Sequence, residues 1–296
     1  MSITTQVFIL FLLVLVGALC RKLGYFTDES IHCTTQIVVN VSLPCTTIVN
    51  MQRPFSTDVL HNFLLTLALS VLLIAGVLIA AQRFFKDRSK KKRAVLANFA
   101  AFSNCGFMGY PIILAINPDW MIYAVAYNIA YVFVAWTLGV SLFCGRENIT
   151  LRRVLLHPNV ISAAIGFTLF CLGITLPAFP GDALSLLSGL TTPLSMLLIG
   201  TRVSGIQLSE FRDKDYHIAS ALRLIVLPMM VYLVLRPFPI APAVAGTLFI
   251  LTAMPGATMT AMQAELFGGD TEFAARAIAY STLLSLVTVP LMSMLL

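Results

Sequence analysis

Charged residues are scarce in this sequence. Asp, Glu, Lys and Arg make up 11% of its 296 residues, and hydrophobic residues make up 58%. Roughly a quarter of the residues of a soluble domain are charged, so this composition excludes a soluble protein and indicates an all-α integral membrane protein. Apolar stretches near the ~20 residues that a spanning helix needs predict ten transmembrane helices, at about 3–24, 30–51, 60–83, 94–116, 120–143, 158–177, 183–203, 217–236, 243–266 and 271–295.

Buried carboxylates are lacking as well. The interiors of the predicted spans 3, 4 and 5 and the middle of span 9 contain no Asp, Glu, Lys or Arg. A cation antiporter needs buried carboxylates to hold and exchange its ions, so this absence argues against that class. Gly268-Gly269-Asp270 loosely resembles the motif of intramembrane aspartate proteases, but no second Asp lies within a span to share the proton.

Clusters that could carry a metal or a catalytic nucleophile are missing from the spans. The six cysteines show no metal-type spacing, and no Ser/His pair lies within a span. We therefore predict that the protein is not an enzyme and binds no metal or cofactor. The first span lacks a basic start and a small-residue cleavage site, so we expect it to stay as a helix rather than be removed as a signal peptide.

The positive charges are distributed unevenly among the predicted loops. Of the 19 Lys and Arg residues, 15 lie in the loops after spans 1, 3, 5 and 7, and only Arg53 and Arg236 lie in the opposite loops. The positive-inside rule makes the basic loops cytoplasmic, so both termini face the external side. This pattern explains the net charge of +6 as a topology signal next to membrane lipid, without a nucleic-acid partner.

Two of the membrane-length segments are interrupted by residues that do not favour a helix. The segment 94–116 carries Asn104, Gly106, Gly109 and Pro111 at its middle, and the segment 243–266 carries Pro255, Gly256 and Thr258. Broken backbone is tolerated within a bilayer only where protein or a water-filled cavity satisfies the freed groups. Paired interruptions at corresponding places in two halves indicate the binding site of a transporter.

The positions of these interruptions indicate an internal repeat. Five predicted spans fall in residues 1–143 and five in 158–296, and 144–157 form a cytoplasmic linker. An odd number of spans per half forces the two halves into opposite orientations. The second span of each half also carries a similar motif, Leu43-Pro44-Cys45-Thr46-Thr47 in the first and Thr191-Thr192-Pro193-Leu194-Ser195 in the second. The sequence thus predicts two inverted five-helix repeats.

The broken helices could bind an anion. The N-terminus of a half-helix carries partial positive charge and free N–H groups, which suit a carboxylate, and the Asn104 amide can both donate and accept hydrogen bonds. Gln263, Arg223 and Arg276 are possible accessory residues. For the two arginines we slightly favour a position in which the side chain reaches the cytoplasmic interface. Glu265 is either an interface residue or a partner of Arg276.

These residues resemble the motifs of the auxin efflux carrier family, which includes bacterial carriers of the malonate and malate permease type. Residues 103–112, SNCGFMGYPI, are similar to the family's Asn-x-x-x-Met-Gly-x-Pro signature. Residues 254–270, MPGATMTAMQAELFGGD, resemble its proline-containing crossover and the segment that follows, and 281–291, STLLSLVTVPL, resemble its last span. The resemblance covers essentially the whole chain.

The resemblance implies a scaffold of helices 1, 2, 6 and 7 and a transport domain of helices 3–5 and 8–10, in which helices 4 and 9 cross at Pro111 and Pro255. It implies that Asn104 takes part in binding an organic-acid carboxylate, and that the protein forms a homodimer through helices 2 and 7. It also implies the bacterial inner (plasma) membrane as the location. Many relatives carry an Asn shortly after the second proline, whereas this chain has Gly256-Ala257-Thr258-Met259.

The sequence therefore predicts a secondary transporter that moves a small organic anion, such as a carboxylate, a dicarboxylate or an auxin-like acid, by alternating access. Two alternatives stay open. One is a sodium-coupled organic-anion symporter with the architecture of a bile-acid transporter. The other is a membrane sensor that binds its ligand without transporting it.

Overall fold

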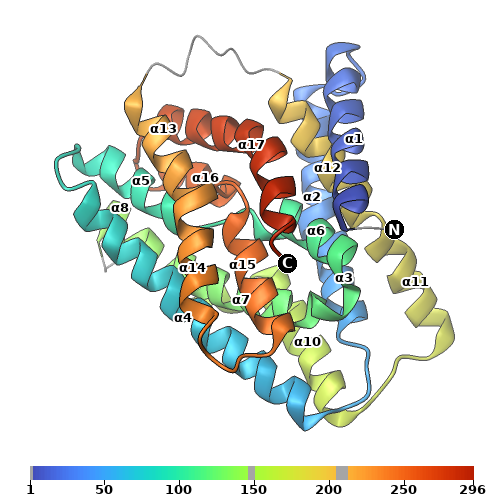
Figure 1. The fold of residues 1–296 in the computed structure, drawn as a ribbon. Coiled ribbons are helices and arrows are strands. Elements are labelled where there is room, and N and C mark those ends of the chain that lie inside the picture. Colours follow the sequence, from blue (N-terminus) through green and yellow to red (C-terminus); the bar gives the residue numbers. More distant parts are fainter. Residues whose placement is uncertain (1–2, 146–150, 205–212) are drawn as a thin grey trace.

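The structure is a computed structural model that describes residues 3–145, 151–204 and 213–296 (Figure 1). The described part of the first half forms α1 (Ile3–Lys22), α2 (Asp28–Ile37), η1 (Val38–Ser42), α3 (Leu43–Asn50), α4 (Thr57–Phe84), α5 (Lys90–Ala101), η2 (Cys105–Gly109), α6 (Tyr110–Ile116), η3 (Pro118–Trp120), α7 (Met121–Val134), η4 (Ala135–Gly139) and α8 (Val140–Cys144). The described part of the second half forms α9 (Leu151–Leu155), α10 (Pro158–Leu172), α11 (Ala178–Gly189), α12 (Thr191–Val203), α13 (Lys214–Ala221), η7 (Leu222–Val226), α14 (Leu227–Leu235), α15 (Pro242–Ala253), α16 (Thr258–Leu266) and α17 (Thr271–Ser293). Part of the predicted linker, 146–150, lies outside the described residues.

Membrane-length helices dominate this fold. Within the described residues, six helical segments are long and apolar enough to cross a membrane, at 5–22, 57–84, 118–144, 178–203, 214–235 and 271–293. Three shorter apolar helices, at 105–116, 158–172 and 242–253, lie in other predicted spans. The prediction of an all-helical integral membrane protein is therefore confirmed. The finer prediction of ten crossings stays a prediction, because helix length and composition support six of them directly.

Three helices widen by one residue per turn just before a proline. The π-helical turns η1, η2 and η7 each end two residues ahead of Pro44, Pro111 and Pro228, respectively. A proline ring clashes with the carbonyl four residues earlier and has no N–H to donate. A π turn, which pairs residues five apart, accommodates both defects. These prolines consequently sit in helices that continue past them.

The helices pack in two groups. In the first group, α1 packs along α12, and α3 packs against α10 and α11, which lies on the outer flank in Figure 1. In the second group, α4 packs against α5 and α7, α14 against α15, and α17 against α13 and α16. Gly17 and Gly200 allow the closest approach of α1 and α12, because a Cβ atom on Gly200 would collide with the backbone of Val14 and Gly17.

Hydroxyl groups join the second and seventh predicted spans. The Thr191 Oγ1 atom lies 2.5 Å from Ser42 Oγ and 2.7 Å from Thr46 Oγ1, and Ser188 Oγ donates to Thr46 Oγ1 at 3.1 Å. Small hydroxyl residues let membrane helices approach closely and hydrogen-bond to each other. The two motifs that suggested an internal repeat thus lie face to face within one chain.

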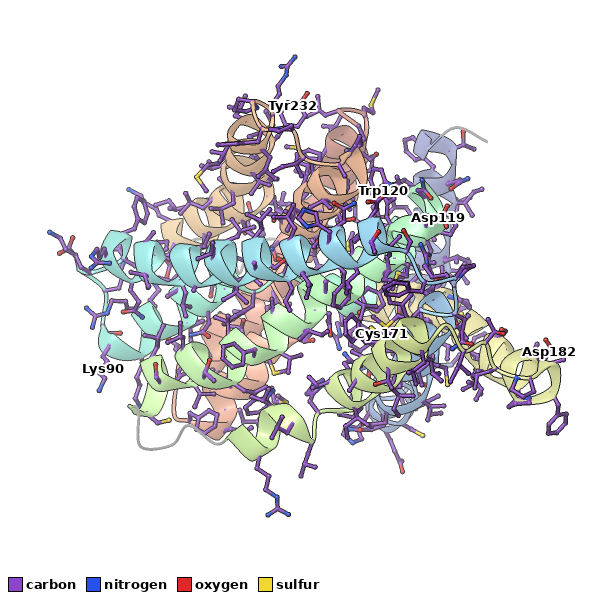
Figure 2. All side chains as sticks on the ribbon, turned by 90° about the horizontal axis from the view of Figure 1, so that it is seen from below. Lys90, Asp119, Trp120, Cys171, Asp182 and Tyr232 are labelled. Carbon is purple, nitrogen blue, oxygen red and sulfur yellow. The ribbon has the colours of Figure 1, made fainter. Side chains whose placement is uncertain are left out.

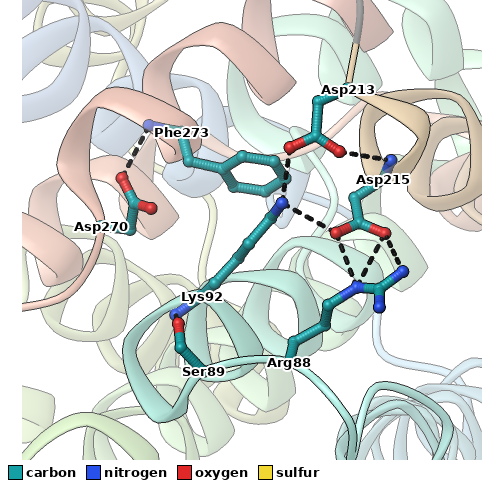
Figure 3. A network of polar contacts seen from close by, with 7 residues as sticks. All are labelled: Arg88, Ser89, Lys92, Asp213, Asp215, Asp270 and Phe273. Carbon is teal, nitrogen blue, oxygen red and sulfur yellow. Dashed lines mark hydrogen bonds and ion pairs between the residues drawn. The ribbon is translucent and has the colours of Figure 1, made fainter.

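A network of charges ties the loop after α4 to the start of α13 (Figure 3). The Asp215 carboxylate, with 3% of its side chain exposed, accepts hydrogen bonds from Arg88 Nε at 2.8 Å and Arg88 Nη2 at 2.8 Å. The Lys92 ammonium lies 2.5 Å from Asp213, 2.8 Å from Asp215 and 4.5 Å from the ring centre of Phe273. Three predicted spans, 4, 8 and 10, are held together by these contacts at one end of the molecule.

The protonation of Asp213 follows from the same contacts. Burial alone would raise the pKa of this carboxyl, but hydrogen bonds from Lys92 and from the Asp215 N–H outweigh burial and hold the pKa below its ordinary value of 3.8. A carboxyl whose pKa falls on folding contributes stability above its ordinary pKa, and that contribution is lost as the pH drops through the lowered value. The network is therefore complete at neutral pH and is released only in strong acid.

Replacing Asp215 with Asn should destabilise this end of the molecule. Asp215 is buried, but Arg88 is 42% exposed and Lys92 keeps Asp213 as a partner, so we expect a smaller loss than for a fully buried ion pair, about 1 kcal/mol. Thermal unfolding of the detergent-solubilised protein at pH 7 measures it. The matched control is Asp182→Asn, since Asp182 is exposed on α11 and lies at the opposite end of the molecule from Lys90 (Figure 2). Equal melting temperatures for both variants would show that the network is not stabilising.

Candidate functional site

Two helices are interrupted at the same place in the fold. α5 ends at Ala101, and the next helical turn begins at Cys105. α15 ends at Ala253, and α16 begins at Thr258. The backbone between these ends is not helical, with extended conformations at Phe102, Met254 and Ala257, so several of its peptide groups are not paired within a helix. Each interruption thus leaves backbone N–H and carbonyl groups that need partners elsewhere.

The two interruptions provide these partners for each other. The Asn104 N–H donates to the Pro255 carbonyl at 2.8 Å, and the Ala257 N–H donates to the Phe102 carbonyl at 2.9 Å. These bonds form a short antiparallel bridge. A membrane interior offers no water to a free peptide group, so the pairing allows both helices to be broken at this depth. The structure therefore brings the two predicted interruptions together.

The first interruption lies earlier than its sequence suggested. Asn104, Gly106, Gly109 and Pro111 were expected at the break, but the non-helical residues are 102–104, which include only Asn104 of these four. Gly106 and Gly109 lie in η2, and Pro111 lies in the first turn of α6. The π turn η2 accommodates this proline within the continuous helix at 105–116, so Pro111 is not the residue at which the helices cross. The second interruption does include Pro255 and Gly256, as expected.

Glycine is required where the two broken helices pack closely. A Cβ atom on Gly256 would overlap the ring of Phe99 in α5. A Cβ atom on Gly109 would lie 2.5 Å from Leu251 Cδ2 in α15. Because Phe99 is fully buried, its ring has little room to move. Gly256 thus fixes the distance between the crossing segments.

A cavity of about 480 Å³ opens beside the crossing. It is bounded by residues from both helix groups: Thr35, Gln36, Val39, Asn40, Leu43, His157, Pro158, Asn159 and Arg202 on one side, and Ser103, Asn104, Cys105, Gly106, Phe107, Asn128, Tyr131, Val132, Trp136, Ala257, Thr258, Met259, Met262 and Leu266 on the other. Its size suits a small-molecule ligand, for which pockets of about 300–1,000 Å³ are usual.

Three of the seven predicted binding residues line this cavity. They are Asn104, Gly106 and Thr258. Asn104 is 5% exposed, and in the described structure its side-chain amide makes no hydrogen bond to protein. The other four, Gly109, Pro111, Pro255 and Gly256, are buried in the packing around the crossing rather than at the cavity wall.

The three possible accessory residues lie away from the cavity wall. Gln263 is fully buried, and its Nε2 donates to the Ala135 carbonyl at 2.8 Å, which holds α16 to the fifth predicted span. Arg276 forms an ion pair with Glu272 at 2.6 Å. Arg223 is 1% exposed, so the expectation that it reaches the membrane interface is wrong.

Several cavity residues were not recognised in the sequence. Arg202 was counted as a loop charge, yet it lies in the last turn of α12, and its guanidinium carbon sits 5.6 Å from the ring centre of Phe107. Gln36 and Asn40 share one helix face and hydrogen-bond to each other at 2.7 Å. Asn128 donates to Cys105 Sγ at 3.2 Å. Gln36 and Asn40 lie four residues apart in the predicted span 2, and this spacing, which places both on one helix face, could have indicated them from the sequence.

The cavity wall is positive. Among the described residues that line it, none is Asp or Glu, and Arg202 carries a full charge. Burial lowers the pKa of His157 from its ordinary value of 6.5, so that imidazole is neutral at pH 7. In the part of the chain that the structure describes, no group of three or more His, Cys, Asp or Glu side chains could hold a metal ion. The arrangement fits an anionic ligand.

These features define an integral membrane transport protein, with broken helices around a largely apolar cavity that carries a few polar groups. The sequence comparison gives the family. Residues 2–150 and, separately, residues 147–293 match the family described as "Membrane transport protein", which is the auxin efflux carrier family. The chain belongs to this family. The two consecutive matches indicate an internal repeat, and the family is one of transporters rather than enzymes.

Two archaeal relatives match the chain over 96% or more of its length. An uncharacterized transporter of Methanocaldococcus jannaschii is 26% identical over 297 residues, which is 96% of this chain and 96% of that protein. An uncharacterized transporter of Methanothermobacter thermautotrophicus is 26% identical over 310 residues, which is 100% of this chain and 99% of that protein. Their descriptions agree with membrane transport and specify no substrate.

Replacing Gly256 with Ala should disrupt the crossing. The added methyl group would push against the buried Phe99 ring, and we expect a loss of about 1–3 kcal/mol from overpacking. The control is Gly76→Ala in α4, where a Cβ atom would meet no other atom within 4 Å. Thermal unfolding in detergent compares the two. A Gly256→Ala protein as stable as the Gly76→Ala protein would contradict this account of the packing.

Proposed function

We propose that this protein is a secondary transporter of a small organic anion, and that the anion binds in the cavity beside the crossing. The observation that carries the proposal is the cavity wall: it presents the unpaired Asn104 amide and the Arg202 guanidinium, and none of the described residues that line it is Asp or Glu. Burying an anion is costly unless positive charge and hydrogen-bond donors compensate it. This wall offers both.

Helix ends add to the attraction. The continuous helix at 105–116 and α16 both begin at the cavity, and Gly106 and Thr258 in their first turns line it. The first amides of a helix have no partner within the helix, and they carry the positive end of its dipole. In our proposal one carboxylate accepts hydrogen bonds from these amides and from Asn104.

The rest of the wall suits an apolar body. Phe107, Trp136, Met259 and Met262 line the cavity along with Val39 and Leu43. Apolar and aromatic side chains surround most small-molecule ligands, and a few polar groups fix their orientation. The substrate class that fits is therefore a monocarboxylic or dicarboxylic acid with a compact carbon skeleton, including aromatic acids.

The position of the cavity supports alternating access. It lies between α2, α10 and α12 of one helix group and α7, α16 and the crossing of the other. We propose that the predicted spans 1, 2, 6 and 7 form a scaffold and that the predicted spans 3–5 and 8–10 form a transport domain that moves against it. This proposal includes the inverted arrangement of residues 1–143 and 158–296 and a homodimer formed through the predicted spans 2 and 7. It also includes a plasma-membrane location with both termini outside.

Replacing Asn104 with Ala should abolish transport of the organic acid. The loss of a hydrogen bond to a charged group corresponds to roughly 10–100-fold weaker binding. Uptake of labelled malonate and of labelled indole-3-acetate into inverted and right-side-out vesicles measures the effect. Expression of the variant is checked on the same vesicles, with Gly76→Ala as the matched control. Unchanged transport by the Asn104→Ala protein would refute the proposed site.

The charge of Arg202 should set affinity for anions. We expect Arg202→Gln to weaken binding of the transported acid roughly tenfold, and Arg202→Lys to weaken it less, because Lys keeps the charge but loses the planar fork. Titration of the purified protein with the acid at pH 7 gives both affinities. The account fails at this residue if Arg202→Gln binds as tightly as Arg202→Lys.

A further inference from the structure

The crossing presents two negative helix ends to one buried side chain. α5 runs from Lys90 to Ala101 and α15 from Pro242 to Ala253, and both end at the interruptions. The last carbonyls of a helix lack partners within it, and they carry the negative end of the helix dipole. Two such ends brought together inside a membrane repel each other unless a positive group lies between them.

Arg223 is that group. Its Nη1 donates to the Ala100 carbonyl at 2.8 Å and to the Ala101 carbonyl at 3.3 Å, at the end of α5. Its Nε donates to the Met254 carbonyl at 3.0 Å, and its Nη2 lies 3.5 Å from the Leu251 carbonyl, at the end of α15. One guanidinium thus joins the last carbonyls of both broken helices.

The charge of Arg223 is deeply buried and is not paired with a carboxylate. The side chain is the largest fully buried one among the described residues. The ion pairs between described side chains do not include Arg223. An unpaired charge in a membrane span is costly, so the carbonyl groups at the two helix ends must compensate it.

The guanidinium and the cavity are separated by the paired backbones. Ser103, Asn104, Ala257 and Thr258 line the cavity, whereas Arg223 does not. The positive helix ends, at the start of η2 and of α16, therefore face the cavity. The negative ends, at the close of α5 and α15, face Arg223. The crossing keeps its cation on one side and offers an anion site on the other.

We propose that Arg223 is a tethered cation that takes the place of a bound Na⁺ at the crossing, so that this protein binds its anion without sodium. In transporters with broken helices, free carbonyls and C-terminal half-helix ends coordinate the coupling Na⁺. Here Arg223 binds the carbonyls at the ends of α5 and α15, and as a covalent side chain it is always present and always charged. The test of whether anion binding depends on sodium rests on the proposed function. The role of Arg223 in stability can be tested without a substrate.

The first test uses stability alone. We expect Arg223→Ala to lower the melting temperature of the purified protein in choline chloride by about 10 °C. Guanidinium at about 20–50 mM should restore at least half of the lost melting temperature, because a cation that binds the vacated site stabilises the folded protein by mass action. Sodium chloride should restore part of it, whereas choline chloride should not. The matched control is Arg236→Ala, an exposed arginine at the outer end of the same span, which should show no cation-specific rescue.

A stable Arg223→Ala protein, or rescue to the same extent by guanidinium and choline, would overturn the proposal. If Arg223→Ala does not fold, Arg223→Lys is measured instead. Arg223→Gln is measured beside it. Lys keeps the charge and Gln does not, so the Arg223→Lys protein should melt at the higher temperature of the two, and equal melting temperatures would overturn the proposal.

The second test measures sodium dependence in the wild type. The affinity for the carboxylate that binds most tightly in a screen of malonate, malate and indole-3-acetate should agree within twofold between sodium chloride and choline chloride. A tenfold or greater loss in choline would overturn the proposal, and would favour the sodium-coupled symporter. Failure of all three acids to bind would count against the proposed function instead, and the rescue of Arg223→Ala would still decide the role of the arginine.

Discussion

Peptide groups that lose their helix inside a membrane have no water to bind, and the whole arrangement of this protein follows from that constraint. The two interruptions satisfy each other through the bonds from Asn104 to Pro255 and from Ala257 to Phe102. This pairing requires a backbone contact that only Gly256 permits, because the Phe99 ring occupies the space of a side chain. The helices around the crossing then pack to hold it in place. Without the pairing, neither broken helix could lie in the interior.

The crossing also separates positive helix ends from negative ones. Helix ends of opposite sign point to opposite sides of the paired backbones, so one side suits a cation and the other suits an anion. Arg223 fills the first side with four contacts to carbonyl groups. In our proposal the substrate fills the second, and Arg202 approaches from the facing helix group. A protein of this kind needs no acidic residue at its site, which agrees with the wall of the cavity.

Sequence reasoning recovered the helical segments because long apolar runs leave little choice in a membrane. It also located the two interruptions, but it misplaced the first, because a π turn accommodates Pro111 and the break falls at 102–104 instead. Arg223 and Arg202 were misjudged for one reason. Whether an arginine near the end of an apolar segment reaches water or turns inward depends on carbonyls and rings supplied by other helices. Composition and spacing do not contain that information.

The central claim is that the cavity beside the crossing carries an organic anion from one side of the membrane to the other. The most direct measurement is counterflow in liposomes that contain the purified protein. Unlabelled acid inside should accelerate the entry of labelled acid above its equilibrium level, and this overshoot should be lost when Asn104 is replaced. Binding of the acid without any overshoot would contradict transport and would identify a membrane sensor.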